Sequence, residues 1–350
     1  KEKQQQVQDT KQITIDRIKK LDKNDELINL QIEKLLNATK ILDEKLQGEE
    51  ALIMKKQFKV AEYSFTGRRN SNEDKELVYS DEKFQFMCVF DGHGGVQTAQ
   101  LCSSSFVETF HHQKVTHPCI QLGDTLLALD EKTQQDASLV GCTAACLLIK
   151  NNKIYFVNAG DARVVVQCKE NVIHQSNDHK ATTQSEIDRL QKIGSNVEIG
   201  RVCGFQGPII AVTRAVGDNQ MKLFGVQAKS ESYQPISCED AEFIVIACDG
   251  VWDVLETEQV CKFVKIALKA AEPENKLEEV YQLMMEGNCN NIQEMTHELR
   301  KPEYLRSRNN ISDIEALKWE ETDPIERKIT ISIIKMAYLL GSADNISAIV

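Results

Sequence analysis

Several apolar segments of this sequence run directly into an aspartate. FQFMCVF leads into Asp91, IYFVNAG leads into Asp161, and FIVIAC leads into Asp249. An aspartate at the end of one strand is an ordinary turn signal. Several such carboxylates would repel one another if their strand ends met with nothing between them. The pattern therefore predicts either a series of turns or a site that holds a cation.

Further acids flank the first and last expected strands. Glu73 and Asp74 follow the first strand in TGRRNSNED, and Asp344 precedes the last strand in GSADNISAIV. Carboxylates, backbone carbonyls and water are the ligands that Mg²⁺ and Mn²⁺ prefer. Zinc is disfavoured because histidine is scarce, with seven in 350 residues. If these acids converge, the expected cofactor is Mn²⁺ or Mg²⁺.

Two residues near the acids point to phosphate chemistry. Arg69 lies four residues before Glu73, and a guanidinium group binds phosphate through paired hydrogen bonds. His93, in DGHGG, can transfer a proton near neutral pH. Two metals, an arginine and a histidine suit hydrolysis of a phosphate ester, in which the histidine protonates the departing alkoxide. On this chemistry alone, a structural cation site and ordinary turns remain alternatives.

The hydrophobic pattern from Phe58 onward predicts a layered α+β domain. Strands are expected at 58–65, 84–90, 142–149, 153–158, 163–168, 243–248 and 345–350. Helices are expected at 96–112, 122–135, 184–193, 256–270, 275–286 and 326–340. The strands cluster, and the helices separate groups of strands rather than follow each strand, which favours segregated layers.

Eight motifs, taken in order, resemble those of the metal-dependent type 2C protein phosphatases. They are R-x₃-E-D (69–74), DGHGG (91–95), GCTA (141–144), NAGDAR (158–163), DHK (178–180), AVTRAVGD (211–218), ACDGVWD (247–253) and GSADNIS (341–347). The resemblance covers roughly residues 58–350. It implies a four-layer α-β-β-α sandwich of two antiparallel sheets flanked by helices, with a binuclear Mn²⁺ or Mg²⁺ centre at one end. It also implies hydrolysis of phosphoserine or phosphothreonine in protein substrates.

The same resemblance assigns roles to individual residues. Asp91 would bridge both metals, Asp249 and Asp344 would complete one of them, and Asp161 with Asp249 and Asp253 is similar to a weaker third metal site. The full set of residues implied to bind metal, directly or through water, is Asp91, Gly92, Asp249, Asp344, Glu73, Asp74, Asp161 and Asp253.

The resemblance also implies two catalytic side chains besides the bridging Asp91. Arg69 would bind the substrate phosphate, and His93 would be the general acid. A member of this family that had lost its activity and served as an interaction scaffold is the main alternative. The presence of every expected metal ligand favours the enzyme.

The motif spacing divides the chain into regions. Residues 56–350 are expected to form the catalytic domain, with a flap at about 180–235 and an insertion at about 288–328. MEGNCNNIQ (285–293) weakly echoes the last motif, with Asn290 at the position of the acid. We assign the ligand to Asp344 instead, because a metal site requires the carboxylate and only the second copy leads into an apolar strand.

Residues 1–55 differ from the rest of the chain, because they lack proline and aromatic residues. Apolar residues with 3–4 spacing predict one or two amphipathic helices: Ile18, Leu21, Ile28, Ile32, Leu35 and Leu42. This helical extension could pack on its own domain, or it could form a coiled coil that binds a partner or a second copy. Fewer than three regular heptads leave both interpretations open.

Composition narrows the compartment and the partners. The net charge of −11 argues against unaided binding to nucleic acid or an anionic membrane. No run of 18 apolar residues occurs, so no transmembrane helix is expected.

The eleven cysteines indicate the compartment. None of them forms a CxxC pair, and this pattern is typical of buried thiols in a cytoplasmic protein, with the nucleus as an alternative. Residue 1 is Lys rather than Met, so a lipidated start is left open. The resemblance to type 2C phosphatases implies phosphoprotein substrates as partners.

Overall fold

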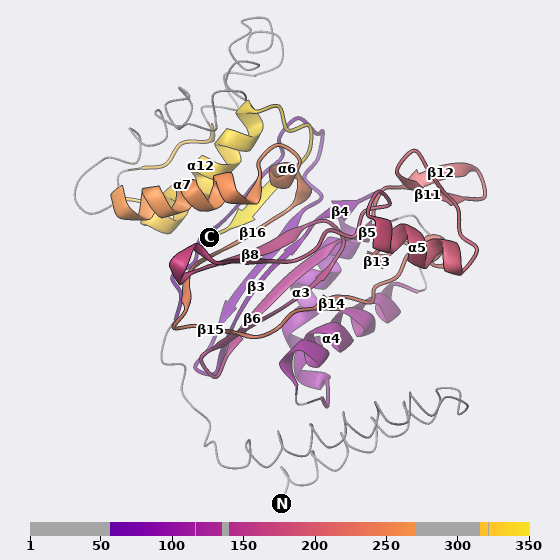
Figure 1. Cartoon of the computed structure of the whole chain (residues 1–350), viewed down its shortest axis with the longest axis horizontal. Helices are drawn as coiled ribbons and strands as arrows, with labels where there is room; N and C mark the ends of the chain where they lie inside the picture. The colour runs from indigo at the N-terminus through magenta and orange to yellow at the C-terminus, as the bar shows by residue number, and fades with distance from the viewer. Residues whose placement is uncertain (1–56, 116, 135–139, 271–315, 321) are drawn as a thin grey trace, which may run out of the picture.

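The computed structural model describes residues 57–115, 117–134, 140–270, 316–320 and 322–350. Two antiparallel sheets face each other, and helices cover the outer face of each sheet (Figure 1). The predicted four-layer α+β sandwich is therefore confirmed for these residues. The helical extension at 1–55, the helix at 275–286 and most of the insertion at 288–328 lie outside them.

The first sheet has six strands, in the order β14-β7-β6-β3-β2, with β15 also paired to β7. Its centre is formed by β3, β6 and β7, whose residues are almost all buried. The strands are β2 (Lys75–Ser80), β3 (Phe84–Phe90), β6 (Ala144–Lys150), β7 (Lys153–Ala159), β14 (Glu231–Ser232) and β15 (Ile236–Ser237).

The second sheet has five strands, in the order β1-β17-β16-β8-β9. Its first and last members in sequence lie side by side, since Glu62 pairs with Ile349 and Phe65 pairs with Ile346. The strands are β1 (Glu62–Phe65), β8 (Arg163–Cys168), β9 (Ile173–Gln175), β16 (Ala241–Ala247) and β17 (Ile346–Ile349).

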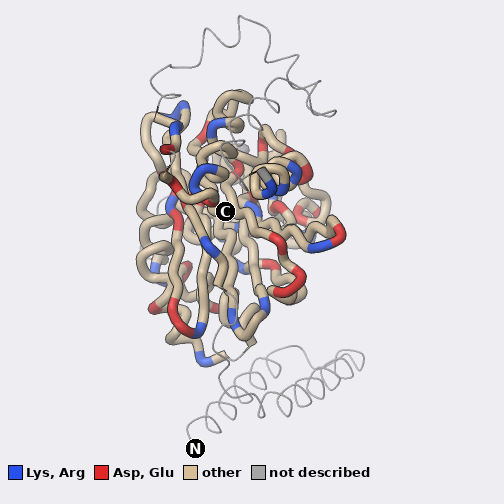
Figure 2. The backbone as a smooth tube through the Cα atoms, turned by 90° about the vertical axis from the view of Figure 1, so that its left-hand side faces the viewer, with Lys and Arg blue, Asp and Glu red and all other residues tan. Residues whose placement is uncertain are grey.

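Alternation along the strands builds three layers of core. In β3, Phe86 and Cys88 face the outer helices, whereas Met87 and Val89 face the other sheet. The long strands are mostly free of charged residues, which gather in turns and on helices (Figure 2). Because both faces of each central strand are covered, these strands are continuous apolar runs and lack the alternation of polar and apolar residues that is typical of a half-exposed strand.

Four long helices form the outer layers. Helices α3 (Gln97–His112) and α4 (Pro118–Thr133) pack on the first sheet, and α7 (Thr257–Ala270) and α12 (Ile325–Leu339) pack on the second. Helix α4 begins four residues before the expected start at 122. Its first residue is Pro118, whose fixed φ and missing N–H suit the first helical position. No described helix is long and apolar enough to cross a membrane.

A smaller unit lies between β9 and β14 in the chain. It contains α5 (Gln184–Lys192), the hairpin strands β10 (Val197–Glu198), β11 (Arg201–Gly204) and β12 (Gly207–Ile210), and the short helix η2 (Met221–Phe224). These elements surround a separate apolar cluster that includes Leu190, Val202 and Met221. This cluster falls within the region predicted as the flap.

Candidate metal centre and active site

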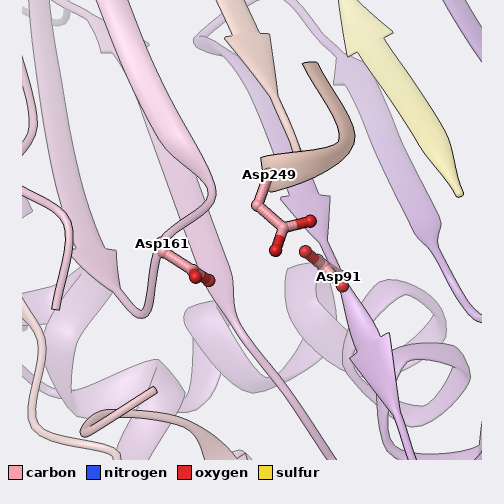
Figure 3. Close-up of side chains that lie close together, drawn as sticks. All are labelled: Asp91, Asp161 and Asp249. Atoms are coloured by element: carbon pink, nitrogen blue, oxygen red, sulfur yellow. The ribbon is translucent and has the colours of Figure 1, made fainter. Parts of the chain in front are cut away.

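Three aspartates from distant parts of the chain converge at one end of the two sheets. Asp91 follows β3, Asp161 lies between β7 and β8, and Asp249 opens the short helix α6 (Asp249–Trp252) after β16. One carboxylate oxygen of each residue lies within 4.8 Å of the others. Figure 3 shows the side chains of Asp91 and Asp249 facing each other, with Asp161 pointing toward them. The predicted convergence of strand-end acids therefore occurs for these three residues.

The carboxylates are held in an environment that disfavours their negative charges. Burial raises the pKa of Asp91 well above its usual range, and the charge of Asp249 raises it further. Burial also raises the pKa of Asp249 well above its usual range, and the charge of Asp161 raises it further. Burial raises the pKa of Asp161 to about 6, although the ammonium of Lys180 partly offsets this. A hard divalent cation would remove the repulsion, and three carboxylate oxygens are suitable donors for it.

The three aspartates line a cavity of about 520 Å³ that contains most of the predicted site residues. Its wall combines acids with two arginines and several apolar residues from the β12 region. The predicted residues on this wall are Arg69, Glu73, Asp91, Gly92, His93, Asp161, Asp249 and Asp344. Asp74 and Asp253 are not part of the wall.

A hydrogen-bonded seam fixes the loop that carries Arg69. The side chain of Asn345 donates to the carbonyls of Thr66 and Ser71 at 2.9 Å each and accepts from the backbone N–H of Glu73 at 2.9 Å. Beside this seam, Arg69 Nη2 lies 2.6 Å from Asp344 Oδ2. The two sequence motifs at opposite ends of the domain are therefore joined at the cavity edge.

His93 is paired with a buried acid on the cavity wall. Its Nε2 lies 2.7 Å from Oδ2 of Asp218, whose side chain is 1% exposed. Burial alone would lower the pKa of His93, but the hydrogen bond and charge of Asp218 outweigh it and raise the pKa. The histidine therefore lines the same cavity as the three aspartates, in a form that readily carries a proton.

The two predicted acids outside the cavity wall have partners of their own. Asp74 accepts a hydrogen bond from Ser347 Oγ at 2.7 Å, and burial raises its pKa to about 7. Asp253 lies 2.8 Å from the ammonium of Lys180, which is also 3.6 Å from Asp161. The place between Asp161 and Asp253, where the third metal was expected, is thus filled by Lys180.

These pKa values predict that the metal-free protein loses stability as pH rises. An acid whose pKa is higher in the folded than in the unfolded state favours folding below its unfolded value, and this contribution disappears as pH rises through the folded value. For Asp161 and Asp74 that window runs from 3.8 to about 6 and about 7. The unfolding temperature of dialysed, metal-free protein should therefore fall as pH rises from about 4 to about 7. A rise over this range would contradict the prediction, and the Mg²⁺-loaded protein is the control, with a weaker dependence.

Comparison with known proteins identifies the family. The family model described as protein phosphatase 2C matches residues 58–292. The chain belongs to the protein phosphatase 2C family. Protein phosphatase 1B of Bos taurus is 31% identical over 220 residues, which is 55% of this chain and 45% of that protein. Protein phosphatase 2C homolog 3 of Schizosaccharomyces pombe is 32% identical over 253 residues, 65% of this chain and 58% of that protein. The chain thus spans about half the length of these relatives.

Solved structures support the fold of this protein phosphatase 2C family member. A C. elegans sex-determining protein superposes with a TM-score of 0.60 at 19% identity, covering 93% of this chain and 72% of that chain. A serine-threonine phosphatase 2C from Toxoplasma gondii gives a TM-score of 0.58 at 16% identity, covering 83% and 93%. At these identities the likeness concerns the fold alone.

The sequence reasoning assigned no role to two residues of the cavity wall. Asp218 and Thr143 both line it, and both carry a buried oxygen without a hydrogen-bond partner among the described residues. Asp218 ends the motif AVTRAVGD and follows a glycine, as Asp161 does in NAGDAR. Thr143 lies in GCTA, and its backbone N–H donates to the carbonyl of Asp91 at 2.9 Å.

Proposed function

We propose that this chain hydrolyses phosphoserine and phosphothreonine in proteins with two Mn²⁺ or Mg²⁺ ions. The observation that carries the proposal is the convergence of Asp91, Asp161 and Asp249 in a cavity that also contains Arg69 and His93. The acids suit cations, the arginine suits a phosphate, and the histidine suits proton transfer. Family membership supports the same reaction.

The metal would be held by Asp91, Asp161 and Asp249, with Asp344 and the backbone of Gly92 on the same cavity wall. A divalent cation bound there would lower the pKa of a water molecule that attacks phosphorus, and it would neutralise negative charge on the phosphoryl group. A Cβ built on Gly92 would collide with the carbonyl of Glu73, so only glycine allows this close approach. A weaker third ion beside Asp253 would have to displace the ammonium of Lys180.

Arg69 is placed to receive the phosphate. Its side chain is 57% exposed at the cavity edge and bonded to Asp344, so the guanidinium reaches solvent while one end stays anchored. Its positive charge offsets the negative charge of the phosphate next to the acidic cluster. We propose that Arg69 binds and orients the phosphoryl oxygens, so that the ester oxygen of the substrate points toward His93.

His93 would complete the reaction as general acid. Water adds to phosphorus, the P–O bond to the serine or threonine breaks, and His93 gives its proton to the departing oxygen. The products are the free hydroxyl side chain and inorganic phosphate. The raised pKa of His93, caused by Asp218 against the opposing effect of burial, keeps this proton on the ring near neutral pH.

Other aspects of the function rest on the sequence. We propose a cytoplasmic location, supported by the cysteine pattern, in which the described cysteines are buried free thiols. We also propose that residues 1–55 bind a partner or a second copy. Phosphoproteins would be the substrates of the cavity.

The test is phosphate release from a phosphothreonine peptide by the purified chain with Mn²⁺ or Mg²⁺. Continuous turnover is expected, and Asp91→Asn is the matched inactive variant. A protein that binds Mn²⁺ by calorimetry but releases no phosphate would instead support the scaffold alternative.

A further inference from the structure

Asp218 has a backbone conformation that an aspartate rarely adopts. Its φ is +52°, and the preceding Gly217 has a φ of +82°. A positive φ is uncommon for any residue with a side chain, so the surrounding structure must hold Asp218 in this conformation. The side chain is almost fully buried, and Oδ1 has no partner among the described residues. Strain and an unpaired buried oxygen at one residue of a cavity wall indicate a functional constraint.

Contacts from α4 and the following segment hold Asp218 in this conformation. Its backbone N–H donates to the carbonyl of Val140 at 3.0 Å. Asp130 of α4 accepts from the N–H of Gly217 at 2.8 Å, and Asn219 donates to the carbonyl of Thr133 at 2.6 Å. The residues on either side of Asp218 are therefore tied to α4, and the carboxylate cannot turn away without breaking these bonds.

The space around the carboxylate is shaped for one partner, the ring of His93. The strands β4 (Gly92–His93), β5 (Gly141–Cys142) and β13 (Val216–Gly217) form a small sheet that brings the two residues together. A Cβ built on Gly141 would collide with Oδ2 of Asp218 and lie 2.7 Å from Nε2 of His93. The glycine of the GCTA motif thus leaves room for this pair.

We propose that Asp218 is the positioning residue of His93. By accepting a hydrogen bond from Nε2, it fixes the ring and leaves Nδ1 as the nitrogen that serves the substrate. A neutral imidazole carries its proton on one nitrogen only, and a carboxylate partner selects which one. The kinetic consequence of this inference rests on the proposed phosphatase function, whereas its structural part does not.

The structural part is tested by NMR of ¹⁵N-histidine-labelled protein, at a pH where the neutral ring predominates. The ring ¹⁵N shifts of His93, assigned by their loss in His93→Gln, should place the proton on Nε2. Asp218→Asn should give a mixture of tautomers, because an amide can face the ring with oxygen or nitrogen. A wild-type proton on Nδ1, or equal tautomers, would overturn the proposal. The wild-type spectrum alone shows which nitrogen carries the proton, so the proposal can be tested even if the Asp218→Asn variant fails to fold.

The kinetic part compares two substrates with different leaving groups. Asp218→Asn should lower kcat for a phosphothreonine peptide by about 10- to 100-fold, the size of loss typical when the hydrogen-bond partner that orients a metal-ligating histidine is removed. Nitrophenyl phosphate should be affected much less, and KM should change little. Equal losses on both substrates would mean that Asp218 supports only the loop.

Asp130→Asn is the matched control, because it removes a carboxylate charge on α4 beside the same loop, including its ion pair with Lys222, while its amide oxygen can still accept from Gly217. It should leave the His93 tautomer and the ratio of the two activities unchanged. If the wild-type chain releases no phosphate but its tautomer is fixed, the proposed function fails and the positioning role stands. If the chain is active and the tautomer is mixed, the positioning role fails alone.

Discussion

Removal of divalent cations is expected to abolish phosphate release, and added Mn²⁺ or Mg²⁺ is expected to restore it. The reason is the mutual repulsion of Asp91, Asp161 and Asp249, whose oxygens lie within 4.8 Å of one another. Without a cation, the cavity presents these acids to a phosphate that is itself negatively charged. Phosphate release from a phosphothreonine peptide should be followed after exhaustive dialysis against EDTA and again after each metal is returned. Full turnover in EDTA would contradict the metal-dependent mechanism.

The same prediction has a form that does not depend on activity. A ligand that binds only the folded state at 100 times its dissociation constant stabilises it by about 2.7 kcal/mol. Mg²⁺ should therefore raise the unfolding temperature of the wild-type chain. Asp249→Asn should abolish most of this rise and most of the turnover. It should also stabilise the metal-free protein, because burial and Asp161 oppose the charge of Asp249.

Asp240→Asn is the matched control for Asp249→Asn. Asp240 precedes β16 and Asp249 follows it, so the two substitutions lie just beyond opposite ends of the same strand. Asp240 is exposed, and its substitution should leave the response to Mg²⁺ intact. An Asp249→Asn protein that still responds to Mg²⁺ like the wild type would remove Asp249 from the metal centre.

The strands that carry the acids could be predicted because their sequences are unambiguous. The run from Phe84 to Phe90 is buried along its whole length, and it ends next to Asp91 as expected. Strand β2 was missed, since KELVYS contains two charged residues and lies at the edge of its sheet, half-buried. Edge strands bury too little of their surface to produce a clear hydrophobic pattern.

Pairings across long sequence separations were not predictable from the motifs. The His93–Asp218 pair spans 125 residues, and it depends on how β4, β5 and β13 meet. The position of Lys180 between Asp161 and Asp253 was likewise missed. A sequence motif identifies the acids, but it does not show which basic side chain lies next to them in the fold.

The choice of Asp344 over Asn290 stays a prediction. Asp344 lies on the cavity wall beside Arg69, and Asn290 is outside the described residues.

His93→Asn is expected to separate substrates by the basicity of their leaving groups. A threonine alkoxide must be protonated as it departs, whereas a nitrophenolate leaves with little help. General acid catalysis typically contributes about 10²- to 10⁴-fold, so kcat for a phosphothreonine peptide should fall by about that factor. The rate with nitrophenyl phosphate should fall much less. KM should change little, because Arg69, which would bind the phosphate, and the acids, which would hold the metal, remain in place.

The size of this difference follows from the surroundings of His93. Its ring lines the cavity with the three aspartates, and Asp218 holds Nε2 at 2.7 Å, so Nδ1 is the ring nitrogen left to protonate the leaving group. Gly141→Ala offers an independent test, because its methyl group would enter the space between His93 and Asp218. It should therefore reproduce the same selective loss without removing the histidine. Equal losses on both substrates in His93→Asn would show instead that His93 supports the loop around Asp91, and the proton donor would have to be another group on the cavity wall.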